Sequence, residues 1–168
     1  MNREEAQPMG GDLIEPFVSS IRHVFSTMFQ LPVQVGTPAV KEGNKCSHDV
    51  SGIIGLSGSY TGTVVLSMPS ETAVAITALF TGHRLDADSD EFADAVGEMV
   101  NIVCGNAKAA LRCREVSISC PSVVVGKNHR VAFQTDTPRV VVPCSTDCGE
   151  IVLEVAIRPA GAEAPLAA

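Results

Sequence analysis

The chain has 168 residues, of which 45% are apolar, so it is long and hydrophobic enough to form one globular domain with a core. Its net charge is −7, and no cluster of Lys and Arg could follow a phosphate backbone, which argues against nucleic-acid binding. The longest apolar runs, near residues 73–80, are too short to cross a membrane, and the N-terminus lacks an apolar signal segment, so we expect a cytoplasmic protein without a membrane anchor.

The first half of the chain predicts one helix followed by strands. Apolar residues recur at helical spacing over residues 13–29, where Asp12 is a suitable N-cap and Pro16 is expected in the first turn. The segment SGSYTG at 57–62 is typical of a tight turn. Strand-like runs are predicted at 50–56 and 62–68, on the two sides of this turn, and at 32–40, earlier in the chain.

The second half repeats the plan with a further helix. A short helix is predicted over 71–80 and is ended by Gly82, and a longer helix is predicted over 90–112, with Asp88 and Glu91 as a capping pair. Strand-like runs follow at 116–125, 130–134, 139–142 and 150–157. Helices and strands in this order predict an α+β fold with an antiparallel sheet and two long helices.

The composition of the chain divides it into a central domain and two tails. Residues 1–11 and the small-residue, Pro-rich segment 159–168 are expected to be flexible, so the domain is assigned to residues 12–158. Within the domain, a shift of 79 positions superposes the apolar positions of the two long helices, so that Phe17 falls on Val96 and Ile21 falls on Val100. This correspondence predicts an internal pseudo-duplication.

The long helix predicted over 90–112 carries a line of polar residues and glycine along one side. At 3.6 residues per turn its members fall within about 40° of one line. They are Asp94, Glu98, Asn101, Gly105, Lys108 and Arg112. The opposite side is apolar and is expected to pack on the sheet, through Phe92, Val96, Met99, Val100, Val103, Ala107 and Leu111. An amphipathic helix needs a polar face in any case, so this pattern alone is compatible with a face that has no function.

Three residues on or beside this line are poor choices for helix stability. Gly97 and Gly105 each cost the helix roughly 1 kcal/mol relative to Ala, and Asn101 costs roughly half as much. A flat strip beside a carboxylate and an amide would suit close docking of another protein, for which we select Asp94, Gly105 and Lys108.

Glu98 and Asn101 together suit the hydrolysis of an aspartyl phosphate. This acyl phosphate is already activated toward water, so a catalyst can act by positioning the water in line. A carboxamide such as that of Asn101 can accept from the water and donate to a neighbour, and the carboxylate of Glu98 can hold a cation of the partner. Residues three apart lie side by side on a helix, so both can enter one cleft.

The pattern D-x-x-x-E-x-x-N at Asp94, Glu98 and Asn101 is similar to the phosphatase motif of the CheC/CheX/FliY group of chemotaxis phosphatases. The runs at 117–133 and 138–157 resemble the strand pairs that follow the motif helix in the single-site CheX branch, and 12–29 resembles the first helix. The resemblance covers roughly residues 12–158 and implies a CheC-like fold.

The resemblance also implies roles and partners. Asn101 would position the hydrolytic water, and Glu98 would pair with the active-site lysine of a phosphorylated CheY-type response regulator. Magnesium would be supplied by that regulator, so the chain would need no cofactor of its own. Proteins of the single-site branch are typically homodimers. Pro121 would lie near the end of the motif.

The number of active sites follows from the duplication. The two-site branch carries a second motif on its first helix, and the shift of 79 positions places Asp94, Glu98 and Asn101 on Glu15, Ser19 and Arg22. The acidic residue at the first position is kept, but the Glu and Asn are replaced. We therefore expect one site in each chain.

Six cysteines and four histidines offer no convincing metal site. Cys144 and Cys148 form an isolated C-x-x-x-C without a second pair or a nearby His, so we expect buried, reduced thiols and no bound metal. The role of this pair is left open.

Two other functions remain compatible with the sequence. The chain could be an adaptor that binds a receiver domain without hydrolysing it, or a structural subunit of a rotor-like assembly, although an adaptor has no reason to keep the Glu98–Asn101 pair. The sequence names neither the regulator nor the pathway, which could be chemotaxis or another two-component system.

Overall fold

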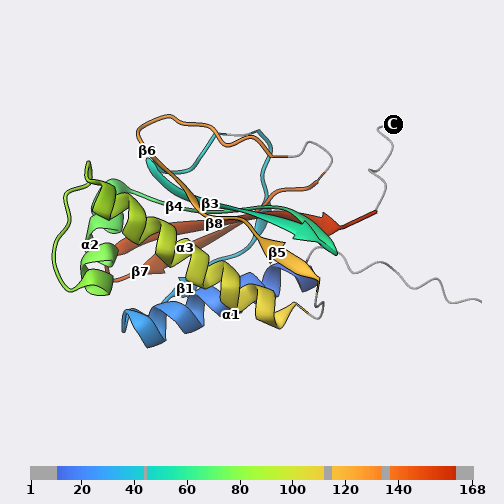
Figure 1. Ribbon diagram of the computed structural model, residues 1–168, viewed down its shortest axis with the longest axis horizontal. Coiled ribbons are helices and arrows are strands. Elements are labelled where there is room, and N and C mark those ends of the chain that lie inside the picture. Colours follow the sequence, from blue (N-terminus) through green and yellow to red (C-terminus); the bar gives the residue numbers. More distant parts are fainter. Residues whose placement is uncertain (1–10, 44, 112–114, 134–136, 162–168) are drawn as a thin grey trace, which may run out of the picture.

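The structure is a computed structural model that describes residues 11–43, 45–111, 115–133 and 137–161. These residues form one antiparallel sheet with helices packed on one of its faces, as predicted for an α+β fold (Figure 1). The predicted tails at 1–11 and 159–168 lie almost wholly outside the described residues.

The described helices are α1 (Gly11–Met28), α2 (Ser70–Thr81) and α3 (Asp90–Ala110). All three were predicted, but two of the predicted N-terminal caps were wrong. Helix α1 already begins at Gly11, so Asp12 lies inside its first turn and Pro16 lies in the second turn. Helix α3 is capped by Ser89 and not by Asp88, because the Ser89 hydroxyl accepts a hydrogen bond from the Phe92 amide at 3.1 Å.

Within the described residues, eight strands make up the sheet. The two long hairpins are β3 (Val50–Gly58) with β4 (Tyr60–Met68) and β7 (Val140–Thr146) with β8 (Gly149–Pro159). The short strands are β1 (Gln34–Val35), β2 (Ala39–Val40), β5 (Val116–Ile118) and β6 (Ser122–Val125).

Several strand predictions need correction. The turn expected at 57–62 shrinks to Ser59 between β3 and β4, because the ladder continues to Gly62 opposite Leu56. The runs at 32–40 and 116–125 each split into two short strands, and residues 130–133 form only an isolated bridge between Arg130 and Lys45. Residue 134 lies outside the described residues.

The sheet has a pseudo-twofold arrangement that agrees with the predicted duplication. Its order is β1-β7-β8-β4-β3-β5, with β2 also paired to β7 and β6 also paired to β3. The last strands of the two halves, β4 and β8, lie side by side at the centre with Val64 opposite Val155. The first strands of each half extend the hairpin of the other half. The pairing also shifts by one residue between β1 and β2 along β7, and between β5 and β6 along β3.

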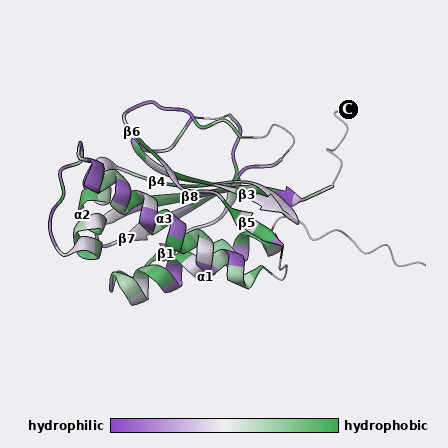
Figure 2. Cartoon of the chain, in the orientation of Figure 1, coloured by the Kyte–Doolittle hydropathy of each residue, from purple (hydrophilic) through white to green (hydrophobic). Residues whose placement is uncertain are grey.

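The main core lies between the sheet and the helices. Alternate residues of β8, such as Leu153 and Val155, are buried against the helices together with Phe17 of α1 and Phe92 of α3. Figure 2 shows hydrophilic residues recurring along α3 between the hydrophobic ones, which is the amphipathic pattern expected of a helix on a sheet.

A buried ion pair holds the loops on the other face of the sheet. Glu154 of β8 is fully buried, and its carboxylate lies 2.7 Å from Arg139 Nε and 3.4 Å from Lys41 Nζ. The guanidinium of Arg139 also donates to the carbonyl oxygens of Gly43 and Lys45, so the loop before β3 is anchored to the sheet. None of the described helices combines the length and apolar content that a membrane crossing needs.

Candidate active site

Helix α3 is held close to the sheet because glycine stands where it crosses β3. A Cβ atom at Gly52 would lie 2.9 Å from the Val100 side chain, which is closer than carbon atoms approach without displacement. On the neighbouring side, a Cβ at Gly97 would lie 3.3 Å from the ring of Pro121 and 3.4 Å from Val123. Gly97 therefore serves the packing of α3 against the β5–β6 region.

Helix α1 fixes α3 from the other side. The Ser20 hydroxyl of α1 donates a buried hydrogen bond of 2.6 Å to the carbonyl oxygen of Val103 in α3. Figure 1 shows the two helices lying alongside each other on the same face of the sheet. The seven residues predicted to form the apolar side of α3 are all buried: Phe92, Val96, Met99, Val100, Val103, Ala107 and Leu111.

The predicted polar line lies on the surface of α3. Asp94 and Glu98 are exposed, whereas Asn101, Gly105 and Lys108 are partly exposed. Arg112, the last member of the predicted line, lies outside the described residues. The five described members therefore share one accessible side of a helix whose other side is fixed in the core.

The side chains of Glu98 and Asn101 are free to meet a partner. Neither makes a hydrogen bond or an ion pair with another described residue. The nearby Asn106 behaves differently, because its amide donates to the carbonyl oxygen of Ile102 at 3.1 Å. One turn of rigid helix thus presents a carboxylate and a carboxamide side by side, with their hydrogen-bonding capacity unused.

Gly105 leaves an open place on the same line. A Cβ atom added there would meet nothing within 4 Å, in contrast to Gly97. Nothing within the described chain therefore requires glycine at this position, although glycine costs the helix roughly 1 kcal/mol relative to alanine. The helix backbone is therefore accessible at Gly105.

The equivalent face of α1 is arranged differently. The Ser19 hydroxyl, at the position that corresponds to Glu98, donates to the Glu15 carboxylate at 2.9 Å within the helix itself. Arg22, at the position that corresponds to Asn101, is exposed and supplies a positive charge in place of an amide. The structure thus offers one Glu–Asn pair, on α3.

The surroundings of the site are acidic and contain no metal-binding cluster. The residues of the described ranges include no group of three or more His, Cys, Asp and Glu that could hold a metal ion. Asp90 and Glu91 occupy the first turn of α3, where the helix dipole favours negative charge. Glu91 also lies 3.2 Å from the ring of His83, and both side chains are more than half exposed.

Cys104 and Cys144 are buried core residues, whereas Cys120 is exposed. Burial raises the pKa of the Cys104 thiol, on the inner side of α3, to about 12, so this thiol stays neutral at physiological pH. Burial likewise raises the pKa of Cys144 to about 11, although the nearby Arg22 partly opposes this shift. Cys148, which is partly buried, is shifted in the same direction. Cys144 is a buried free thiol and Cys148 is a partly buried one, in agreement with the expectation of buried, reduced thiols.

The sequence did not reveal which residues fix α3 in place. Ser89, Ser20 and Gly52 are common residue types whose partners lie far along the chain or depend on the exact helix start. A Ser one residue before a helical pattern is the only one of these signals that the sequence carries.

Known proteins share both the sequence pattern and the fold. The family model for the chemotaxis phosphatase CheX matches residues 50–145 of this chain. The CheY-P phosphatase CheX of Thermotoga maritima is 24% identical over 126 residues, which is 73% of this chain and 81% of that protein.

Two solved structures extend this likeness over nearly the whole chain. A CheC-like superfamily protein from Shewanella sp. PV-4 has a TM-score of 0.80 and 31% identity, covering 89% of this chain and 99% of that one. A chain of the CheX–CheY complex with BeF3 and Mg2+ from Borrelia burgdorferi has a TM-score of 0.73 and 28% identity, covering 88% of this chain and 98% of that one. The expected CheC-like fold is confirmed.

Proposed function

Because this chain belongs to the chemotaxis phosphatase CheX family, we propose that it hydrolyses the aspartyl phosphate of a CheY-type receiver domain. The observation that carries the proposal is the position of Glu98 and Asn101 on the accessible side of a rigid helix. Neither side chain makes a hydrogen bond or an ion pair with another described residue. The named relative from Thermotoga maritima is a CheY-P phosphatase, which supports the choice of substrate class.

Asn101 is proposed as the catalytic residue that orients water. Its side-chain oxygen accepts a hydrogen bond from the water, while its nitrogen donates to an oxygen of the receiver's active site. This arrangement holds the water in line with the phosphorus–oxygen bond to the aspartate, so the bond breaks and inorganic phosphate leaves as the P–O bond to water forms. The free carboxamide of Asn101 supports this role, since no described neighbour competes for it.

Glu98 is proposed to hold the receiver in register. Its exposed carboxylate, one turn before Asn101, pairs with the active-site lysine of the receiver, and this charge-assisted bond orients the phosphoryl group toward the water. Asp94, Gly105 and Lys108 complete the proposed docking strip along the same side of the helix.

Magnesium belongs to the partner in this proposal. The related Borrelia complex contains both CheY and Mg2+, which supports a metal that arrives with the receiver. We also place the activity in the cytoplasm. The five cysteines that the structure describes are free thiols, which suits a reducing compartment.

A homodimer is part of the same proposal. Residues 140–142 of β7 are not available for pairing with a second copy, because β7 lies between β8 and the short strands β1 and β2. Strand β6 lies at an edge of the sheet beside β3, and its Val125 is exposed. The free backbone groups of β6 can pair with β6 of a second copy about a twofold axis. Light scattering should give a mass near twice 17.6 kDa, and a monomer at micromolar concentration would contradict the proposal.

The decay of a radiolabelled phosphoryl group tests the function directly. Each receiver domain of the source organism is phosphorylated and followed with and without this protein, and one of them should lose its label many times faster in its presence. The Asn101→Ala variant serves as the control, because it should still bind the receiver without accelerating the decay. Binding without acceleration by the wild-type protein would show an adaptor in place of an enzyme.

A further inference from the structure

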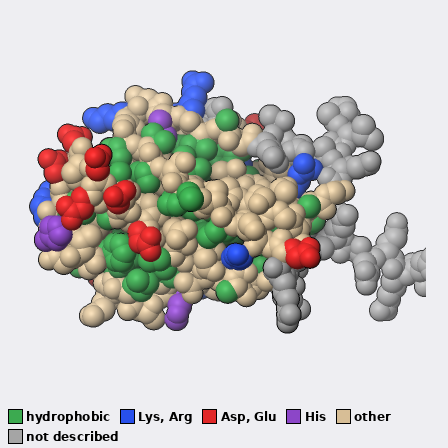
Figure 3. Space-filling model, viewed as in Figure 1, with side chains coloured by type: hydrophobic (Ala, Val, Ile, Leu, Met, Phe, Trp, Pro, Cys, Tyr) green, Lys and Arg blue, Asp and Glu red, His purple; other side chains and the backbone are tan. Residues whose placement is uncertain are grey.

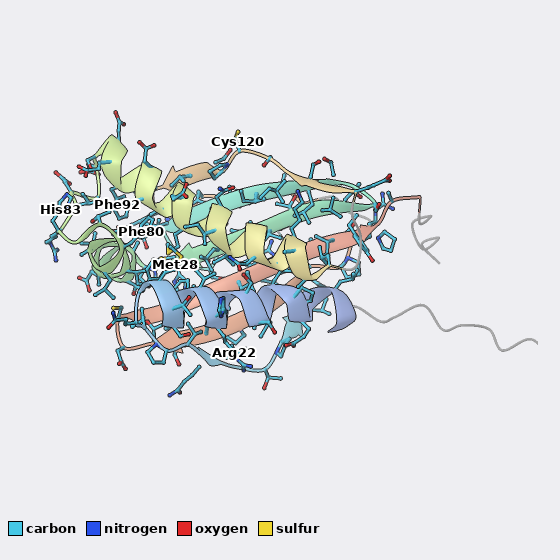
Figure 4. The ribbon with its side chains drawn as sticks, turned by 60° about the horizontal axis from the view of Figure 1, so that its bottom comes forward. Arg22, Met28, Phe80, His83, Phe92 and Cys120 are labelled. Atoms are coloured by element: carbon cyan, nitrogen blue, oxygen red, sulfur yellow. The ribbon has the colours of Figure 1, made fainter. Side chains whose placement is uncertain are left out.

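An exposed apolar surface lies at the end of the molecule where α3 begins. Met28, the last residue of α1, is 46% exposed, and Leu79, near the end of α2, is 49% exposed. Their neighbours in sequence join the two helices, since the rings of Phe29 and Phe80 meet edge to face at 5.4 Å. Figure 4 shows Met28 close to Phe80 at this corner. We call the exposed Met28 and Leu79, together with the partly buried Phe80, the corner patch.

The corner patch borders the side of α3 that carries Glu98. Helix α2 packs against α3, and the loop between them contributes further acidic residues. Figure 3 shows hydrophobic side chains gathered over α2 and the end of α1, with acidic side chains in an arc beside them over the start of α3. The acidic ridge consists of exposed residues only: Asp86, Asp88, Asp90, Glu91, Asp94 and Glu98.

The chemistry of this surface selects one kind of partner. A surface of apolar side chains beside a row of carboxylates fits a protein that presents an apolar side chain flanked by Lys or Arg. A second copy of this chain fits this patch poorly, because it would bring its own acidic ridge against the first one. Helix α2, which carries Leu79 and Phe80, packs against α3, where the receiver is proposed to bind.

We propose that the corner patch and the acidic ridge form an accessory docking surface for the phosphorylated receiver domain. The inference rests on the proposed function. The corner patch increases the affinity for the receiver, and the acidic ridge attracts a basic surface of the receiver. Asn101 orients the water that hydrolyses the phosphate. Because the contacts of the corner patch are equal in the bound state and in the transition state, their loss should raise KM and leave kcat unchanged.

The test measures binding and turnover separately. The dissociation constant is determined by calorimetry with a receiver domain loaded with beryllofluoride and Mg2+, which cannot be hydrolysed, and turnover is followed by phosphate release. Leu79→Gln and Met28→Gln should each raise the dissociation constant about fivefold, the value expected when roughly half of such a side chain no longer leaves water. Turnover at saturating receiver should stay at the wild-type rate.

Val40→Gln is the matched control, because Val40 is 72% exposed and lies on β2, at the edge of the sheet that is remote from β6. This variant should bind as the wild type does.

A rise in salt concentration should weaken wild-type binding by screening the acidic ridge. Circular dichroism of each variant establishes that it is folded, and Leu79→Ala provides a second, less polar replacement.

The outcomes separate this inference from the proposed function. Dissociation constants within twofold of the wild type for both corner-patch variants would overturn the accessory surface, even if Asn101→Ala abolishes turnover. A corner-patch variant that changes the mass of the free protein would show that a second copy covers the patch. If Asn101→Ala turns over normally, the catalytic assignment is wrong, whereas the binding data still decide the role of the patch. Failure of every receiver to bind the wild type would overturn both.

Discussion

Helices α1 and α3 occupy equivalent places in the two halves of the fold but present different outer surfaces. Both bury one apolar side against the same sheet, and Phe17, Ile21 and Val24 of α1 match buried positions of α3. On the outer side, α3 carries the unpaired Glu98 and Asn101, whereas α1 carries Ser19, which is bonded to Glu15 within the helix.

This difference shows which part of a duplicated helix is free to change. The inner side is constrained by close packing, so replacement of a buried residue costs several kcal/mol. The outer side contributes little to packing, so substitutions there usually change stability by less than about 0.5 kcal/mol. A catalytic pair can therefore stand on one copy and be absent from the other without loss of the fold.

The largest expected effect comes from removing the amide of Asn101. Asn101→Ala should lower receiver dephosphorylation by about 10²–10³-fold, or about 3–4 kcal/mol of transition-state stabilisation, because the water loses its orienting group. Stability should not fall, because alanine is the better helix former. Asn106→Ala is the control on the same helix, since the Asn106 amide is bonded to Ile102. Equal rates for Asn101→Ala and the wild type in a phosphate-release assay would refute the assignment.

A smaller effect is expected from Glu98. Glu98→Ala should reduce kcat/KM by about 10- to 100-fold through loss of a charge-assisted bond to the receiver, with both binding and rate affected. Glu15→Ala on α1 removes an exposed carboxylate of the other half and should leave kcat/KM unchanged. Steady-state kinetics at several receiver concentrations compare the two, and an equal loss in both variants would point to net charge in place of a specific contact.

The open place at Gly105 offers a test of close docking. Gly105→Gln adds a side chain that meets nothing in the described chain, so the helix should become more stable while KM rises about tenfold, which is about 1.4 kcal/mol. Ser26, the position of α1 that corresponds to Gly105, is exposed, and Ser26→Gln is the matched control. Thermal unfolding and kinetics measure both effects. An unchanged KM for Gly105→Gln would exclude this position from the interface.

The smallest effect is expected on the outer side of α1. The double variant Ser19→Ala with Arg22→Ala should keep the wild-type rate within about twofold and the wild-type stability within about 0.5 kcal/mol, because both residues are exposed. Figure 4 labels Arg22 on this helix. A clear loss of phosphatase rate would mean that α1 contributes to the site.

The periodicity of apolar residues was sufficient to find the helices and the long hairpins. A helix packed on a sheet needs apolar residues every three to four positions, and a half-buried strand needs them every second position, so local spacing reports both. The same spacing separated the buried side of α3 from the line that contains Glu98 and Asn101. The segment at 130–134 was misassigned because its alternation comes from a loop whose Val131 packs in a small cluster on the other face of the sheet.

Residues whose role depends on distant partners could not be interpreted from the sequence. Gly97 and Gly105 look alike in the helical pattern, yet only Gly97 lies against Pro121, because β5 and β6 return to the side of α3. The sequence likewise did not show that Met28 and Leu79 are both exposed beside the edge-to-face contact of Phe29 and Phe80 that joins α1 to α2.

The sequence by itself determined the α+β class, the amphipathic helices and the pair Glu98 and Asn101, since all of these depend on neighbours within one or two turns. Only the tertiary structure decided that β6 and not β7 lies at a sheet edge, that Gly97 serves packing, and that Glu154 is neutralised by Arg139 in a buried pair. The physical reason is range: backbone periodicity is local, whereas edges, close approaches and buried ion pairs arise between segments that fold together from distant parts of the chain.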